Sequence, residues 1–65
     1  MNTPTRVISI RLQIEEVKRE IDMRRSVYPG QVRRGAMRQG VADEHMARMA
    51  AVLETLQRVA RETGD

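Results

Sequence analysis

MRRSVYPGQVRRGAM, which occupies residues 23–37, separates two segments whose apolar residues recur with helical spacing. Pro29 disfavours helical geometry at the residue before it, and a glycine follows directly, so the run has the signature of a helix stop. We therefore expect the first helix to end at about residue 28. A short turn or helix at residues 31–34, closed by Gly35, then leads into the second helix. The chain is predicted to reverse direction here.

The segment before this run predicts an amphipathic helix over residues 4–28. Thr3 suits the N-cap position, and Pro4 suits the first helical position, where a missing N–H breaks no intrahelical bond. Apolar residues then alternate at spacings of three and four over about three heptads, as in a helix that packs against another helix. This row, the first half of a predicted seam between helices, consists of Val7, Ile10, Ile14, Val17 and Ile21.

The segment after the run predicts a second helix over residues 39–62. Asp43 and Glu44 lie near its start and basic residues near its end, an arrangement that complements the helix dipole. Gly64 provides a C-terminal stop. The apolar spacing matches that of the first helix, and the second half of the seam consists of Met46, Met49, Leu53 and Leu56.

These two helices predict an all-α fold, an antiparallel αα-hairpin that forms one domain over residues 1–65. A chain of 65 residues buries little surface, and this one has no cysteine to form a disulfide. Ile8, Leu12, Val52 and Val59 lie beside the seam, where a lone hairpin leaves them uncovered. We therefore expect a homo-oligomer, a dimeric or larger helical bundle. The alternative is a single hairpin whose flanking apolar residues stay partly exposed.

The sequence argues against catalysis and against a membrane span. It contains no Ser/His/Asp or Cys/His arrangement, no Gly-rich phosphate loop and no HExxH motif, so we predict neither an enzyme nor a cofactor. His45 is the only histidine, and without cysteine it does not predict a metal site. No apolar run approaches the ~20 residues of a membrane span, and the first residues lack a signal-peptide core. The expected location is the cytoplasm.

Positive charge is concentrated around the predicted reversal. Residues 18–38 contain seven basic and two acidic side chains, a net of +5, whereas the whole chain carries +3. Arginine binds carboxylates and phosphates through a planar fork of donors, and a tyrosine can anchor an interface or stack on a base. The alternative is a solvated connector whose charges keep the protein in solution. The candidate partner-binding residues are Arg24, Arg25, Tyr28, Arg33, Arg34, Met37 and Arg38.

The same region carries a resemblance. MRRSVYP at residues 23–29, then Val32, Gly35 and Met37, and the run at residues 42–56 are similar to small helical proteins encoded by tailed phages and prophages of Gram-negative bacteria. Residues 32–56 also resemble the short helical SHOCT module, although Arg38 stands where that module usually has a Ser or Thr cap. The likeness to the SHOCT module implies a role in oligomerisation or in tethering other domains.

The phage resemblance implies a small non-enzymatic interaction protein in the cytoplasm of a bacterial host. Its expected partner is a host or phage protein, for example one of the defence, repair or transcription machinery. Two alternatives stay open: a nucleic-acid or nucleotide-binding accessory protein that uses the same arginines, and a structural assembly factor. Nucleic-acid modules usually show a recognisable scaffold or several aromatic residues, and this chain has one aromatic. A protein partner is therefore the leading expectation.

Overall fold

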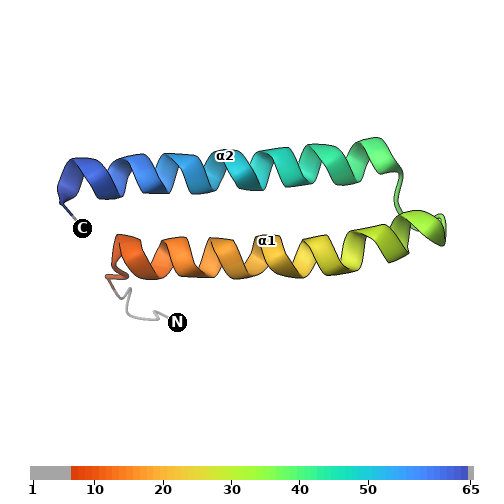
Figure 1. Ribbon diagram of the computed structural model, residues 1–65, viewed down its shortest axis with the longest axis horizontal. Coiled ribbons are helices and arrows are strands. Elements are labelled where there is room, and N and C mark those ends of the chain that lie inside the picture. The colour runs from red at the N-terminus through yellow and green to blue at the C-terminus, as the bar shows by residue number, and fades with distance from the viewer. Residues whose placement is uncertain (1–6, 65) are drawn as a thin grey trace, which may run out of the picture.

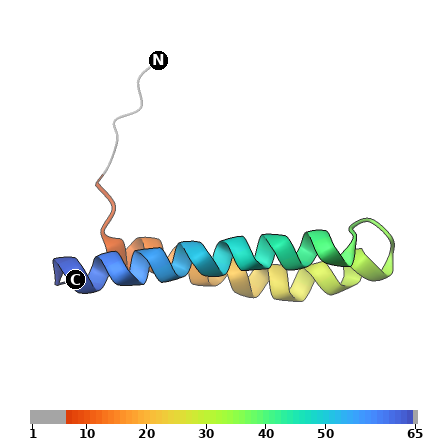
Figure 2. The same ribbon diagram turned by 90° about the horizontal axis from the view of Figure 1, so that it is seen from above.

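Two antiparallel helices make up the fold. In the computed structural model, which describes residues 7–64, α1 is Ile10–Arg33 and α2 is Gln39–Thr63. Figure 1 shows the two helices side by side, joined by a short loop at one end. Seen from above in Figure 2, they cross at a shallow angle. The part of the chain that the structure describes contains no strand, and the predicted all-α hairpin is confirmed.

The core lies along the line where the helices face each other. Within residues 7–64, Ile21 and Ala42 are the only buried residues, with 7% and 3% of their surface exposed. A hairpin covers each helix from one side only, so the side chains around these two stay in contact with water. The other seam residues of the two helices are half-buried: Ile10, Ile14, Val17, Met46, Met49, Leu53 and Leu56.

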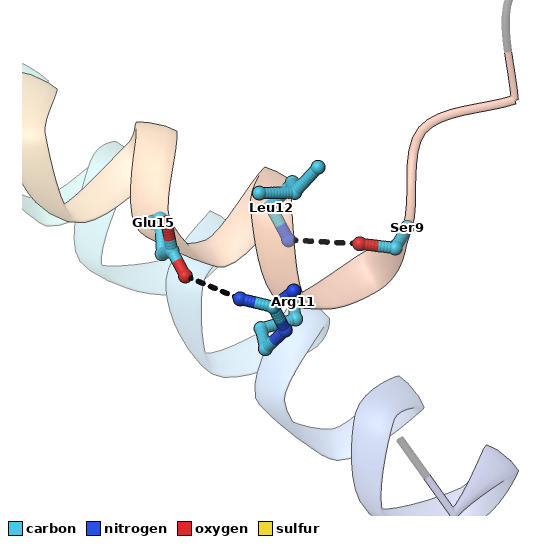
Figure 3. A network of polar contacts seen from close by, with 4 residues as sticks. All are labelled: Ser9, Arg11, Leu12 and Glu15. Carbon is cyan, nitrogen blue, oxygen red and sulfur yellow. Dashed lines mark hydrogen bonds and ion pairs between the residues drawn. The ribbon is translucent and has the colours of Figure 1, made fainter.

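Helix α1 begins later than the sequence predicted. The side-chain oxygen of Ser9 accepts a hydrogen bond from the backbone N–H of Leu12 at 3.2 Å, which makes Ser9 the N-cap (Figure 3). Gln13 donates from its side chain to the Ile8 carbonyl at 2.9 Å and holds the chain entry in place. The predicted start at residue 4 is therefore wrong, because residues 7–9 are not helical. Val7 is 97% exposed, so its assignment to the seam is also wrong. The proposed caps at residues 3 and 4 lie outside the described residues.

Helix α1 also ends later than predicted, because it continues through Pro29 to Arg33. A proline inside a helix removes one hydrogen bond, here the one to the carbonyl of Arg25, and its ring pushes that carbonyl away at a cost of about 3 kcal/mol. Figure 1 shows the consequence as a bend in the yellow-green last turns of α1, which lean towards α2. This bend keeps the half-buried Tyr28 and Val32 against α2, and that packing offsets the cost.

A glycine in the left-handed region ends α1. Gly35 has a φ of 77°, and its N–H donates to the Val32 carbonyl at 3.0 Å. The N–H of Ala36 donates to the Gln31 carbonyl at 2.9 Å, which completes a Schellman motif. Residues 31–34 thus belong to α1 or its cap and form no separate turn, although Gly35 does close them as predicted. Gly64, with a φ of 78°, caps α2 and confirms the predicted stop.

Replacement of Gly35 by alanine should destabilise the protein by about 1–2 kcal/mol, because an L residue in the left-handed region meets its own carbonyl. No other atom lies within 4 Å of the added Cβ, so backbone strain is the only cost. Gly40→Ala is the matched control: it lies in α2 with the same open space, and there alanine gains up to about 1 kcal/mol of helix propensity. Chemical denaturation of both variants measures the difference, and equal stabilities would contradict the assigned cap.

Candidate functional site

The end of the hairpin where the chain reverses is basic and open to solvent. Arg33, Arg34 and Arg38 lie on either side of the loop that joins α1 to α2, and all three are exposed. Among residues 7–64, none of the three forms an ion pair. We call these three arginines the basic tip. Their guanidinium groups can donate paired hydrogen bonds to carboxylate or phosphate oxygens that approach from solvent.

The start of α2 adds to the positive potential of the basic tip. Arg38 is the N-cap residue of α2, and its side chain makes no capping hydrogen bond, because a guanidinium has no acceptor. The first turn of α2 contains no acidic residue either. The nearest carboxylates of α2, Asp43 and Glu44, lie in its second turn, where they bind Gln39 and Arg48. The positive end of the α2 dipole points in the direction of the tip arginines.

Arg24 and Arg25, which the sequence analysis assigned to the tip, lie on the body of α1 instead. Nε of Arg24 donates to Oε1 of Glu20 at 2.8 Å, and both side chains are about two-thirds covered. This hydrogen bond raises the pKa of the Arg24 guanidinium above its ordinary value, so the group stays charged. Arg25 lies 3.9 Å from Asp22. Both arginines have an acidic partner one helical turn earlier, so we leave them out of the basic tip, and their part in partner binding stays a prediction.

Tyr28 is part of the packing between the helices. Its ring centroid lies 6.5 Å from that of His45, with the planes tilted by 59°, and both residues are half-buried. The predicted role of Tyr28 in an interface stays a prediction. The contact between Tyr28 and His45 could have been predicted from the position of the loop, because residues at equal distances from the loop of an antiparallel hairpin face each other. Met37, in the loop, is half-buried and borders the basic tip.

The two sides of the seam differ in chemistry. On one side, which we call the charged flank, a groove of about 600 Å³ runs between α1 and α2, with Lys18, Asp22 and Glu54 among its lining residues. A smaller groove of about 240 Å³ continues it towards the loop, and both share Arg25 and Met46. On the opposite side, helical spacing places Val27 of α1 with Val41, Val52 and Val59 of α2, and we call this side the valine flank.

The described residues offer no metal centre, since no group of three or more His, Cys, Asp or Glu side chains comes together in residues 7–64. In the same part of the chain, neither helix is both long and apolar enough to cross a membrane. Comparison with protein-family models, with curated proteins and with solved structures finds no match to this chain. Residue chemistry and geometry therefore carry the functional proposal.

Proposed function

We propose that this chain is a small non-enzymatic interaction protein whose basic tip binds an acidic surface of another protein. The observation that carries the proposal is the clustering of exposed, unpaired arginines at the tip. Five arginines on the helix bodies are paired with a carboxylate on their own helix: Arg11, Arg19, Arg24, Arg25 and Arg48. Six exposed basic side chains have no such pair within residues 7–64: Lys18, Arg58 and Arg61 are spread along the helices, whereas the three tip arginines lie within six residues of each other at the loop. Their charge is available to a partner.

The packing of Tyr28 favours a protein partner over nucleic acid. Proteins that bind single strands stack bases on exposed aromatic rings, and those that bind duplexes spread positive charge along a groove or a helix face. The one aromatic ring of this chain is packed against His45, and the tip contains three unpaired cations at one end of the hairpin. A compact patch of arginines suits a cluster of carboxylates better than it suits an extended backbone.

The resemblance of residues 23–37 to phage and prophage proteins supports a partner in the bacterial host or in the phage itself. We propose defence, repair or transcription machinery as the class, and the host cytoplasm as the location. Binding through arginines at an exposed loop needs no cofactor and no bond-breaking chemistry. The second candidate function is binding of the same patch to phosphate, in a nucleic acid or a nucleotide, because the start of α2, whose first turn has no acidic residue, also favours anions.

The test replaces the basic tip and a matched set of arginines. Arg33→Ala, Arg34→Ala and Arg38→Ala together lower the net charge by three, and so do Arg11→Ala, Arg19→Ala and Arg48→Ala, whose side chains are 73%, 76% and 69% exposed. We expect the tip variant to weaken binding to a partner purified from nuclease-treated host lysate by about tenfold or more, and the control to bind as the native chain does. Surface plasmon resonance with the purified partner measures both.

Two results would change the assignment. Equal binding by the tip variant and the native chain would show that the basic tip is not part of the interface. Submicromolar binding to DNA or RNA that weakens steeply with salt, and that the tip variant loses, would replace the protein partner by nucleic acid. Fluorescence anisotropy with labelled oligonucleotides at two salt concentrations distinguishes these cases.

A further inference from the structure

The valine flank is apolar and open. Val41 and Val52 are each 45% exposed, and Val27 is 42% exposed. These three valines are the large apolar residues on this side that the hairpin leaves uncovered. His45 and Val59, in the same row of α2, are half-buried. The charged flank has exposed Lys18, Asp22, Arg25, Asp43 and Glu54 in the corresponding places. Of the two flanks, the valine flank is therefore the one whose exposed large side chains are apolar, as on a surface that is covered in solution.

Charge on the valine flank cancels within the flank. Its central charged residues are Glu20 and Arg24, which bind each other at 2.8 Å with 33% and 27% of their side chains exposed. The other ion pairs of residues 7–64 have side chains at least 59% exposed. Arg48, at the edge of the flank, is paired with Glu44 at 2.9 Å. Because this face is neutral and its ion pair is already formed, it has no excess charge to attract a strongly charged partner. Two copies of the face can also pack together without repulsion between like charges.

The residues of the flank are arranged symmetrically about the middle of the hairpin. His45 and Val59 lie seven residues on either side of Val52, which is near the middle of α2. Glu20 and Arg24 lie on either side of the middle of α1. The contact between Tyr28 and His45 sets the register of the two helices and brings these two midpoints to the same level. A single two-fold axis that crosses the flank at this level would therefore place Glu20 opposite Arg24 of a second copy. The same axis would place Val52 opposite Val52 of that copy.

We propose that a second copy of this chain covers the valine flank, with the two hairpins antiparallel in a four-helix bundle. Antiparallel packing pairs His45 with Val59 of the other copy and makes the Glu20 and Arg24 charges complementary across the interface. It also holds the two basic tips at opposite ends, about 36 Å apart for helices of this length, and avoids the repulsion of six arginines at one end. This inference goes beyond the proposed function and is independent of what the basic tip binds.

Val52→Lys tests the interface, because it places two ammonium groups next to the two-fold axis. The native chain should sediment as a dimer at about 10 μM, and the variant should sediment as a monomer, with its dissociation constant raised on the order of 100-fold. Ala50→Lys is the matched control: it adds the same charge at an exposed site of α2 on the charged flank, and it should leave the dimer intact. A folded native monomer, or dissociation by Ala50→Lys and not by Val52→Lys, would overturn the proposal.

Cysteine cross-linking decides the orientation without introducing charge. The native chain has no cysteine, so Val52→Cys and Met37→Cys each introduce a single thiol. Mild oxidation should link Val52→Cys chains into covalent dimers, because antiparallel packing brings the two thiols together, and should link Met37→Cys chains poorly, because the loops are far apart. Efficient linking of Met37→Cys alone would overturn the antiparallel arrangement. Both variants keep the arginines of the basic tip, so failure here is distinguishable from failure of partner binding.

Discussion

Ile21→Ala is expected to leave most of the protein unfolded at 25 °C. Ile21 is 7% exposed, and truncation of a buried isoleucine to alanine costs about 2–5 kcal/mol in lost transfer free energy and cavity formation. A chain of this size has about 3–5 kcal/mol of stability from one core. The cost is therefore comparable to the whole free energy of unfolding. Circular dichroism at 222 nm should show a large loss of helix, and thermal unfolding should lose its cooperative transition.

Leu12→Ala is the control for this substitution. Leu12 lies on the same helix and loses the same number of carbons, but it is 42% exposed, so the expected loss of stability is below about 1 kcal/mol. The comparison separates burial from helix propensity, because both variants place alanine inside α1. If Leu12→Ala unfolded the protein as much as Ile21→Ala did, the core would not lie on the seam side of α1.

Ala42→Asp should prevent folding altogether. Ala42 is 3% exposed and lies where the bent last turns of α1 approach α2, beside Tyr28 and Val32. A carboxylate at this position would lose its hydration without gaining a partner, which costs several kcal/mol. Because residue 42 is near the start of α2, the helix dipole would stabilise the carboxylate by about 0.3–1 kcal/mol, which is less than the cost of its desolvation. Urea titration followed by helix content should show no folded baseline.

Ala51→Asp provides the comparison for that result. Ala51 is exposed on the same helix, so an aspartate there costs about 0.7 kcal/mol of helix propensity and no desolvation. A protein with Ala51→Asp should unfold cooperatively at slightly lower urea than the native chain. Similar behaviour of the two variants would mean that the helices do not approach each other at Ala42.

Local sequence was sufficient for the class of the fold and for the side of each helix that faces its neighbour. The seam rests on a repeat of three and four residues, and this repeat alone places Ile21 and Leu53 on the inner face, because side chains at these spacings share one side of a helix. The end of α2 followed from Gly64, since a glycine after the last apolar residue supplies the left-handed cap. Such features depend on residues within one or two turns of each other.

The charge of the loop region was also visible in the sequence. Arg24 and Arg25 lie inside both the predicted helix, residues 4–28, and the observed α1, with Glu20 and Asp22 four and three residues before them. Side chains at these spacings meet on one face of a helix, so the spacing separates these two arginines from the loop, whereas the summed charge of residues 18–38 does not.

Only the tertiary structure decided how Pro29 is accommodated and what Tyr28 does. By local rules a proline ends a helix, because it lacks the N–H and disfavours helical geometry at the residue before it. Here the turns after Pro29 are held by the Gly35 cap and by contact with α2, through Tyr28 against His45. These contacts join residues 17 positions apart in the chain, so their free energy appears only once the hairpin has closed. Periodicity within each segment determined the two helices, and packing between them determined where α1 ends.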